Sequence, residues 1–249
     1  MYTETSFEGK VALVTGSGNG IGYSIGLKLM ELGAKVIFHY HSQSEKLLQL
    51  QHIYGNDQCH VVQADFSSSE DVLRMFSDAW QWQDKIDILI NNAALIDPVS
   101  SITKISEDDL QKTMQINFVA PFLLMKMLLE NSQNTGEIIR IASISSIAVK
   151  YGGSPQMVHY MASKAALESG TLALAKHSSS SILANVLRVG VTNTDAHKRL
   201  GRDDLSARES LIPIGRAAEP EEIADVVIFL VSPLNTYLTG AIVPVAGGE

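Results

Sequence analysis

Short apolar runs alternate with longer amphipathic segments along this chain. Most of the short runs are apolar throughout and rich in β-branched residues, which is typical of strands in a sheet covered on both faces. We expect these strands at Val11–Thr15, Val36–Tyr40, His60–Ala64, Ile86–Asn91, Glu137–Ala142, Ala184–Val189 and Ala241–Val245.

The longer segments carry apolar residues at helical spacing. They predict helices at Gly20–Leu32, Ser44–Ile53, Ser69–Trp82, Ser106–Asn131, Met157–His177 and Pro220–Leu230. Strands that alternate with helices of this length are joined by crossovers, and crossovers of this kind connect parallel strands. The pattern therefore predicts an α/β fold, a doubly wound parallel sheet of about seven strands with helices on both faces.

Local signals refine two of these helices. Ser106, with Asp109 three residues later, is typical of a helix N-cap, and Ser69 is a second candidate cap. Pro121 falls inside the fourth helical segment, where its missing N–H and its ring are expected to kink or split the helix.

The composition favours one domain over residues 1–249. The chain has 45% hydrophobic and 18% charged residues, enough to bury a sizeable core, and no linker or repeat interrupts it. The net charge of −8, from 19 basic and 27 acidic residues, argues against a nucleic-acid partner. The single Cys59 excludes an intramolecular disulfide and is expected to be a buried thiol.

The sequence also bears on location and on metals. The segment Met1–Lys10 lacks the apolar stretch of a signal peptide, and no apolar run is long enough to span a bilayer. We therefore expect a cytoplasmic protein that is not bound to a membrane. The seven histidines form no pattern of metal ligands, so no metal site is expected.

A glycine-rich turn follows the first predicted strand. It reads Thr15-Gly16-Ser17-Gly18-Asn19-Gly20-Ile21-Gly22, or T-G-x-x-x-G-I-G, and it leads into the first predicted helix. Glycines at such a junction let backbone N–H groups approach a pyrophosphate, which the helix N-terminus then stabilises. The turn therefore predicts a dinucleotide site.

This turn resembles that of the short-chain dehydrogenase/reductase family, and the resemblance extends over essentially the whole chain. Asn91-Asn92-Ala93-Ala94 is similar to the family's N-N-A-G, with Ala94 in place of glycine, a change that is strained only if φ is positive there. The C-terminal Pro220–Ala224 and Gly247-Gly248 also match, whereas Val189-Gly190 replaces the usual Pro-Gly and Ala246 an Asp or Asn. The resemblance implies a Rossmann-type fold and hydride transfer between NAD(P)(H) and a carbonyl or secondary alcohol.

Tyr160 and Lys164 form the strongest candidate for catalysis. At positions i and i+4 of a helix they share one face. Reduction of a carbonyl ends with a proton delivered to a developing alkoxide, and a phenol with a pKa of about 10 is poorly matched to neutral pH. We expect the Lys164 ammonium to lower the pKa of Tyr160 and to hold the nicotinamide ribose.

The resemblance implies two further catalytic side chains, a serine and an asparagine. Counted from Gly136, Ser143 takes the serine's position at the end of the fifth strand and is expected to polarise the carbonyl. Ser145 and Ser146 are alternatives, because the stretch from Ser143 to Tyr160 contains an insertion that we assign to Lys150–Gln156. Asn117 matches the helix asparagine that supports a proton-relaying water.

The resemblance also implies which residues bind the dinucleotide. Tyr40 ends the second strand, where NAD-selective relatives place a carboxylate, and its neighbours His41 and Ser42 can donate to a 2′-phosphate. Asn19 stands where phosphate-selective relatives often place a cation, so NADP(H) is expected to be favoured only modestly over NAD(H). The expected set is Gly16, Asn19, Gly20, Ile21, Tyr40, His41, Ser42, Asp65, Asn91, Ala93, Tyr160, Lys164, Val191 and Thr194.

These observations favour an oxidoreductase acting on a small carbonyl or alcohol substrate that the sequence does not identify. The alternative is a catalytically idle dinucleotide sensor or scaffold, which the loss of Tyr160, Lys164 or the serine would favour. A mobile substrate lid is expected over Asp195–Arg216, and His159 is a candidate substrate contact. The fourth and fifth helical segments are apolar over more than one face, which predicts a homo-oligomer, a homotetramer. That prediction depends on Leu123, Leu124, Met127, Leu128, Ala166, Leu167, Leu172 and Leu174.

Overall fold

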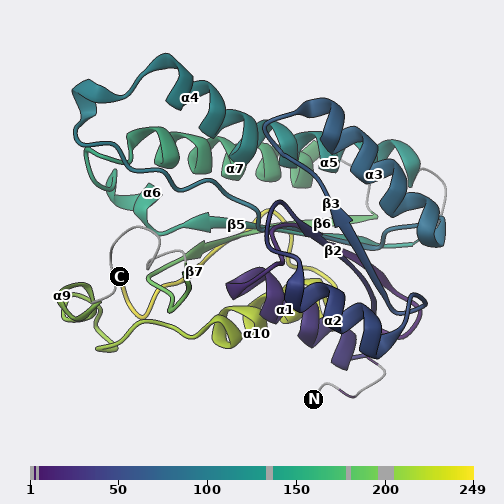
Figure 1. The fold of residues 1–249 in the computed structure, drawn as a ribbon. Coiled ribbons are helices and arrows are strands. Elements are labelled where there is room, and N and C mark those ends of the chain that lie inside the picture. The colour runs from purple at the N-terminus through teal and green to yellow at the C-terminus, as the bar shows by residue number, and fades with distance from the viewer. Residues whose placement is uncertain (1–2, 4–5, 133–136, 178–180, 196–204) are drawn as a thin grey trace.

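A computed structural model describes residues 3, 6–132, 137–177, 181–195 and 205–249. In these residues one parallel sheet forms the centre, with the strand order β3-β2-β1-β4-β5-β6-β7 (Figure 1). The chain starts in the middle of the sheet and extends it first to one side and then, from β4, to the other. The strands are β1 Val11–Val14, β2 Lys35–Tyr40, β3 Cys59–Gln63, β4 Ile88–Asn91, β5 Ile139–Ser146, β6 Ile182–Val189 and β7 Ile242–Val245.

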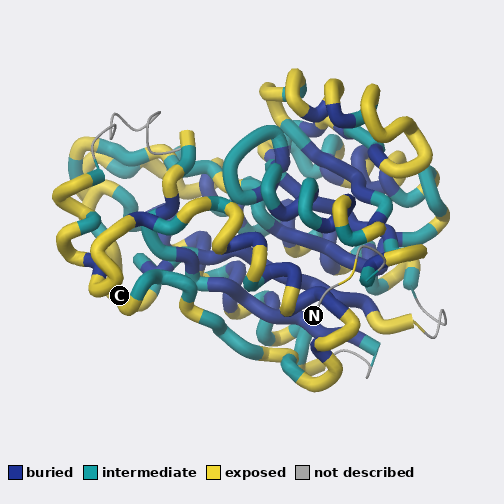
Figure 2. Tube along the Cα trace, turned by 90° about the horizontal axis from the view of Figure 1, so that it is seen from below, coloured by how far each residue is buried: buried dark blue, intermediate teal, exposed yellow. Residues whose placement is uncertain are grey.

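Helices cover both faces of the sheet, which confirms the predicted α/β fold. In Figure 1, α1, α2 and α10 lie below the sheet, and α3, α4, α5 and α7 lie above it. Each face has its own apolar core, so the central strands are buried on both sides (Figure 2). The α-helices are α1 Gly20–Glu31, α2 Glu45–Tyr54, α3 Ser69–Gln83, α4 Glu107–Met114, α5 Ala120–Asn131, α6 Ala148–Tyr151, α7 Val158–His177, α9 Ser206–Glu209 and α10 Pro220–Val231.

Strand β5 differs most from its prediction. It begins at Ile139 and continues to Ser146, four residues beyond the predicted end at Ala142. The extension is paired residue for residue with β6, from Ser143 opposite Val186 to Ser146 opposite Val189. The end of the strand, where ligand-binding groups of such sheets gather, is therefore at Ser146 and not at Ser143.

The long helical segment before Asn131 is split, as Pro121 predicts. Helix α4 ends at Met114, a π-helical turn (η2, Gln115–Val119) follows, and α5 begins with Pro121 in its first turn. Ser106 and Asp109 form a capping box at the start of α4. The predicted cap at Ser69 is wrong, because the Ser68 side chain accepts from the Asp71 N–H and Ser69 is already helical.

Further sequence predictions can be compared with the described residues. Cys59 is a free, buried thiol, and its pKa is raised to about 11 by burial. Asp84 is the only non-glycine residue with a positive φ in the described part of the chain, so Ala94 is accommodated without backbone strain. None of the helices described here is both long and apolar enough to cross a membrane.

Candidate active site

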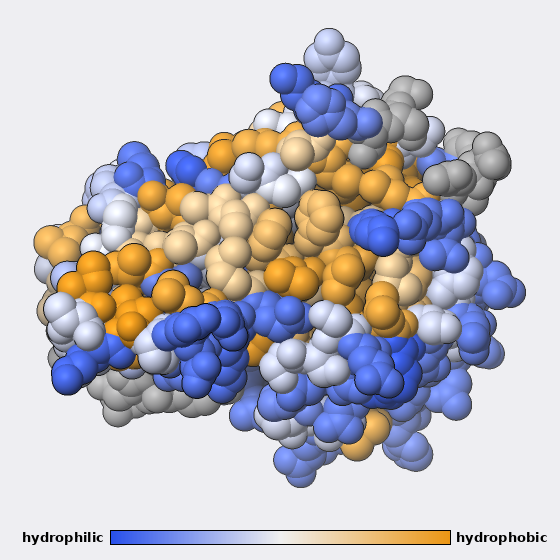
Figure 3. Space-filling model, turned by 90° about the horizontal axis from the view of Figure 1, so that it is seen from above, coloured by the Kyte–Doolittle hydropathy of each residue, from blue (hydrophilic) through white to orange (hydrophobic). Residues whose placement is uncertain are grey.

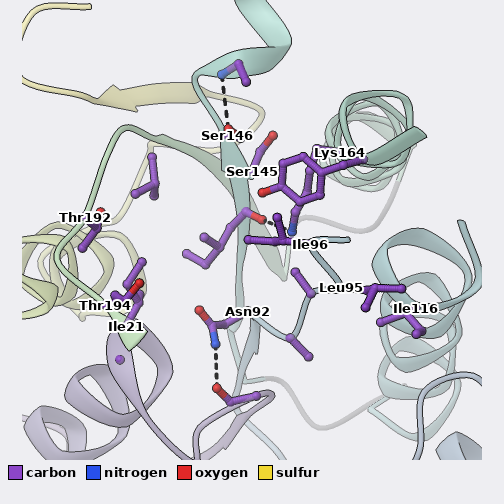
Figure 4. Close-up of a pocket in the computed structure, with 18 of the residues that line it drawn as sticks. Ile21, Asn92, Leu95, Ile96, Ile116, Ser145, Ser146, Lys164, Thr192 and Thr194 are labelled. Atoms are coloured by element: carbon purple, nitrogen blue, oxygen red, sulfur yellow. Dashed lines mark hydrogen bonds between the residues drawn. The ribbon is translucent and has the colours of Figure 1, made fainter. Parts of the chain in front are cut away.

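A cleft of about 1260 Å³ opens at the carboxyl edge of the sheet, where the strand order reverses between β1 and β4. Ligands of open α/β sheets bind at this switch point. The segments that follow β1 to β6 all contribute to its walls, and Figure 4 shows side chains from several of them converging on one space. The cleft brings together every predicted site residue except three, Asn91, Asn117 and Ser143.

The glycine-rich turn is packed so closely that it admits no side chain at three of its glycines, Gly16, Gly18 and Gly22. Gly16 has φ +63°, and a Cβ there would lie 2.7 Å from the Cα of Ala93. A Cβ on Gly22 would lie 2.5 Å from both the Asn92 Nδ2 and the Gly16 carbonyl oxygen. Thr15 connects the turn to the end of β4, because its Oγ1 accepts from the N–H groups of Asn92 and Ala93, each at 3.0 Å.

Helix α1 begins at this turn without a side-chain cap. Asn19 occupies the N-cap position, but its side chain bonds to Gln43 and not to the helix backbone. The first N–H groups of a helix have no partners within it, and an anion is the ligand they favour. The bare glycine surface and the uncapped helix together fit the pyrophosphate of a dinucleotide.

His39 supports the glycine-rich turn by a hydrogen bond to its backbone, a role that the sequence analysis missed. The Gly16 N–H donates to its Nδ1 at 3.1 Å, so Nε2 carries the proton and donates to the Ala64 carbonyl at 3.1 Å. The ring stacks on Phe66 with centroids 4.2 Å apart. Burial lowers the pKa of His39 to about 4, so the ring is neutral at physiological pH and Nδ1 stays an acceptor.

The ends of β2 and β3 form the next part of the wall. Tyr40, His41 and Ser42, which are predicted to bind the dinucleotide, all line the cleft, and none of them carries a fixed charge. The His41 Nε2 lies 3.9 Å from the Oδ2 of Asp65. The pKa of Asp65 is lowered, first by the hydrogen bond from the Ser67 backbone and less by His41.

Tyr160 and Lys164 lie one helical turn apart on α7 and both line the cleft. A hydrogen bond joins the hydroxyls of Tyr160 and Ser146, which connects α7 to the end of β5. The Lys164 Nζ donates to the Ile144 carbonyl at 2.7 Å and lies 6.0 Å from the centre of the Tyr160 ring. Figure 4 shows Ser145 and Ser146 on the strand beside Lys164 on the helix.

The expected lowering of the Tyr160 pKa is not found. Burial raises the pKa of Tyr160 to about 12, and the hydrogen bond from Ser146 only partly opposes it. Burial also lowers the pKa of Lys164 to about 8, a shift that the nearby Glu168 carboxylate opposes. Burial therefore dominates the pKa of Tyr160, and at neutral pH Tyr160 holds the proton that a reduction requires.

The structure brings Ser146, and not Ser143, into the cleft. Ser143 is fully buried inside β5, where its Oγ accepts from the Thr171 hydroxyl at 2.8 Å and from the Asn91 amide at 3.4 Å. Asn91 points into the same interior, while its neighbours Asn92 and Ala93 line the cleft. The expected place of Ser143 at the cleft is therefore not found, because β5 is longer than its sequence pattern suggests.

Asn117 lies behind the cleft and not in its wall. It belongs to the π-helical turn η2, is fully buried, and bonds in both directions to the backbone of Leu95, at 2.7 and 3.0 Å. Its Nδ2 also donates to the Ser163 hydroxyl at 2.9 Å. Asn117 therefore fixes the segment after β4 against the helix that carries Tyr160.

The other residues singled out from the sequence do not all line the cleft. Val191 and Thr194 line the cleft, as predicted. His159 is buried and bonds to the Asp97 carbonyl at 2.8 Å, so it packs beside the site without facing it. Residues 196–204 of the predicted lid lie outside the described residues, whereas Leu205 and Arg208 line the cleft. No group of three His, Cys, Asp or Glu side chains that could hold a metal ion is present among the residues with defined positions.

Curated proteins and a family model match nearly the full length of the chain. A model described as enoyl-(acyl carrier protein) reductase matches residues 16–249. The chain is 33% identical to the 3-oxoacyl-(acyl-carrier-protein) reductase FabG of Aquifex aeolicus over 251 residues, or 98% of this chain and 99% of that protein. It is 36% identical to FabG of Pseudomonas aeruginosa over 248 residues, or 98% of each chain.

Solved structures agree with this similarity. A short-chain dehydrogenase from Burkholderia cenocepacia in complex with NADP superposes with a TM-score of 0.84 at 27% identity, over 98% of both chains. A short-chain dehydrogenase/reductase from Brucella melitensis, described as glucose/ribitol dehydrogenase, superposes with a TM-score of 0.89 at 26% identity. That match covers 99% of this chain and 98% of the other.

Proposed function

The chain belongs to the short-chain dehydrogenase/reductase family, and on this premise we propose that Tyr160 donates the proton when a carbonyl compound is reduced with NADPH. The chain is an oxidoreductase that moves a hydride between NAD(P)(H) and a carbonyl or alcohol. The observation that carries the proposal is the buried, protonated Tyr160 hydroxyl, hydrogen-bonded to Ser146 in the cleft beside the glycine-rich turn.

The glycine-rich turn and the uncapped start of α1 are suited to hold the pyrophosphate. Tyr40, His41 and Ser42 would surround the adenosine ribose, and Lys164 would hold the other ribose. When bound, the reduced dinucleotide supplies the hydride that the carbonyl carbon accepts.

Three side chains would act on the carbonyl oxygen. Ser146 donates a hydrogen bond to it, which stabilises the negative charge that develops during reduction. Tyr160 then transfers its proton to this oxygen, and the product is the alcohol. The Lys164 ammonium stabilises the phenolate that Tyr160 becomes. Asn117 acts as a positioning residue, because its hydrogen bonds to Leu95 and Ser163 hold the segment after β4 against the helix that carries Tyr160.

We assign a modest preference for NADP(H) over NAD(H). No carboxylate stands at Tyr40 to repel a 2′-phosphate, and His41 and Ser42 offer hydrogen-bond donors. A solved relative binds NADP. The preference is small, about tenfold or roughly 1.4 kcal/mol, because an imidazole contributes less than a guanidinium and the Asp65 Oδ2 lies 3.9 Å from the His41 Nε2.

The substrate is proposed to have an apolar body. Next to the reacting hydroxyls the cleft is lined by Ile147, which follows Ser146, by Met157, which directly precedes α7, and by Met161, which follows Tyr160 on α7. Such side chains favour an acyl or aromatic group over a sugar or a charged chain. The names of two relatives, 3-oxoacyl-(acyl-carrier-protein) reductase and hydroxynaphthalene reductase-like protein, agree with this class.

The single domain, the cytoplasmic location and the homotetramer remain predictions. Of the residues used for the tetramer, Leu124, Leu128 and Leu167 are buried within the chain itself, which weakens that argument. The outer side of α5 still exposes Phe122, at 42%, and Figure 3 shows a broad apolar area on the face formed by the helices above the sheet. A second copy of the chain is the partner proposed for this face.

A substrate panel tests the proposal. The purified chain is mixed with NADPH and with a β-ketoacyl thioester, an aromatic ketone or an α,β-unsaturated thioester, and absorbance of the reduced nicotinamide is followed. Reduction of a ketone supports the proposal. Reduction of the carbon–carbon double bond alone, or dinucleotide binding without turnover of any compound, contradicts it and favours an enoyl reductase or an idle sensor.

A further inference from the structure

Helix α7 and strand β5 are joined by a ladder of hydrogen bonds that extends well beyond Tyr160. Each turn of one helix face reaches a residue near the end of the strand. Tyr160 bonds to Ser146, Lys164 to the Ile144 carbonyl, Glu168 to Ser145, and Thr171 to Ser143. The catalytic hydroxyls thus occupy the end of a continuous interface.

Glu168 is the unusual member of this ladder, because it is a carboxylate with a side chain only 6% exposed. One oxygen, Oε1, accepts from the Ser145 hydroxyl at 2.7 Å and from the Arg188 Nε at 2.8 Å. The other, Oε2, accepts from the Arg188 Nη2 at 2.6 Å. Ser145 and Arg188 are register partners on β5 and β6, so both face α7 from neighbouring strands.

A buried ion pair of this kind is a poor way to gain stability. Removing the Glu168 carboxylate from water costs free energy that its attraction to Arg188, whose side chain is 24% exposed, only partly returns, and apolar residues of similar size are often as stable or more so. The charge of Glu168 also lies one helical turn from Lys164, on the same face of α7. The small net stability expected of the ion pair and the position of Glu168 beside Lys164 together point to an effect of the carboxylate on Lys164.

We propose that Glu168, held by Arg188 and Ser145, is a positioning residue that keeps Lys164 in its ammonium form at the pH where the enzyme works. The inference rests on the proposed function, since the ammonium matters because it stabilises the Tyr160 phenolate. Burial alone drives Lys164 toward the neutral amine, and Glu168 is the group that opposes it. Arg188 fixes the carboxylate in one place by two hydrogen bonds.

The other charged or titratable groups near Lys164 leave Glu168 as the main influence. Helix α7 itself carries His159 beside Tyr160. Strand β5 contributes Arg140 and neutral serines, and β6 contributes Arg188, whose charge is paired with Glu168. The helices α4, α5 and α6 and the turn η2 also pack against α7. Their charged or titratable side chains are Glu107, Asp108, Asp109 and Lys112 on α4, Lys126 and Glu130 on α5, and Lys150 and Tyr151 on α6, whereas η2 has none.

The sign of the effect follows from this arrangement. A carboxylate favours the ammonium, so its removal lowers the pKa of Lys164 further below the value of about 8. Lys164 then loses its ammonium proton at a lower pH, and with it the stabilisation of the Tyr160 phenolate that the reduction requires. The alkaline midpoint of the pH–activity profile therefore shifts to lower pH, while activity near pH 6, where Lys164 keeps its proton, changes little.

The test compares Glu168→Gln with two matched controls. In Glu168→Gln the alkaline midpoint of kcat/KM is expected to fall by about one pH unit, equivalent to tenfold lower activity on the alkaline side. Glu168→Asp keeps the charge, and Ser145→Ala removes only a hydrogen bond, so both midpoints stay within about 0.3 units of wild type. A uniform loss of activity at every pH, with the midpoint unchanged, would overturn the proposal.

A second measurement avoids the reaction altogether. The protein without dinucleotide is labelled with ¹³C-lysine, and the Cε resonance that disappears in Lys164→Arg is titrated in each variant. A lower midpoint in Glu168→Gln supports the proposal, and an unchanged one overturns it. If wild type reduces no compound in the panel, the proposed function fails, yet this titration still decides the inference.

Glu168→Gln could unfold because it leaves Arg188 without its partner. The double variant Glu168→Gln/Arg188→Gln leaves neither charge behind and keeps polar groups that can pair. Its lysine titration is expected to move in the same direction as that of Glu168→Gln. A folded double variant with the wild-type midpoint would also overturn the proposal.

Discussion

Substitution of the two serines of β5 distinguishes the site seen in the structure from the one that the sequence suggests. Ser146 lies in the cleft and bonds to Tyr160, whereas Ser143 is buried three residues earlier in the same strand. Both variants remove one hydroxyl and leave the same small side chain. Their effects on turnover and on stability are nevertheless expected to differ in kind.

Ser146→Ala removes the donor that stabilises the developing negative charge. Loss of one such donor costs about 3 kcal/mol, or on the order of a hundredfold in kcat. The effect on stability is small, because the Ser146 hydroxyl is only partly buried and its backbone bond to the Ala148 N–H, at 3.2 Å, is a local one. Dinucleotide affinity is expected to change little.

Ser143→Ala acts on the fold. Thr171 keeps its bond to the Leu167 carbonyl at 2.8 Å, but the Asn91 amide loses its partner inside the sheet. An unmet buried polar group costs about 1–2 kcal/mol, which in a chain of this size lowers Tm by roughly 2–8 °C. Turnover of the folded protein is expected to stay within about threefold of wild type.

The assay is the initial rate of NADPH oxidation at saturating substrate, together with a thermal unfolding curve for each variant. The reasoning is refuted if Ser143→Ala loses more kcat than Ser146→Ala at equal folded fraction. Ser145→Ala, whose hydroxyl bonds to Glu168, provides an internal comparison.

Four further predictions concern the cofactor, the stability and the assembly. His39→Leu deprives the Gly16 N–H of its acceptor and is expected to weaken dinucleotide binding about tenfold, whereas His39→Asn retains more affinity; equal affinities by calorimetry would refute this. The pKa of His39 is about 4 when folded and near 6.5 when unfolded, so its contribution to stability is lost as pH falls through this window, and His39→Leu should flatten that decline. The ratio of kcat/KM for NADPH over NADH is expected to be about ten, and a clear NADH preference contradicts the assignment at Tyr40 and His41. Light scattering is expected to give a multiple of the 27.0 kDa chain mass, and a monomer would contradict the proposed assembly.

The fold could be predicted from the sequence because its signals are local and repeated. Most strands of this parallel sheet are buried and mainly apolar, and each of the seven was found from its own residues. Pro121 and the Ser106 capping box similarly act over a single turn. Tyr160 and Lys164 were found together for the same reason, since helical spacing alone puts them on one face.

The errors arose where the outcome depends on contacts distant in the sequence. Ser143, Ser145 and Ser146 are polar, so the pattern ended β5 at Ala142, yet pairing with β6 and bonds to α7 extend it to Ser146. The structural role of His39 depends on Gly16 and Ala64, which no spacing rule connects to it. The pKa of Tyr160 depends on burial, which the i, i+4 spacing with Lys164 does not show.

Replacement of Tyr160 by phenylalanine tests the central claim most directly. The ring still packs in its buried position, so only the hydroxyl and its proton are lost. With a carbonyl substrate from the panel, kcat is expected to fall by at least about a hundredfold, while the Kd for NADPH stays nearly the same. A variant that keeps more than about a tenth of wild-type turnover would contradict the assignment of Tyr160 as the proton donor.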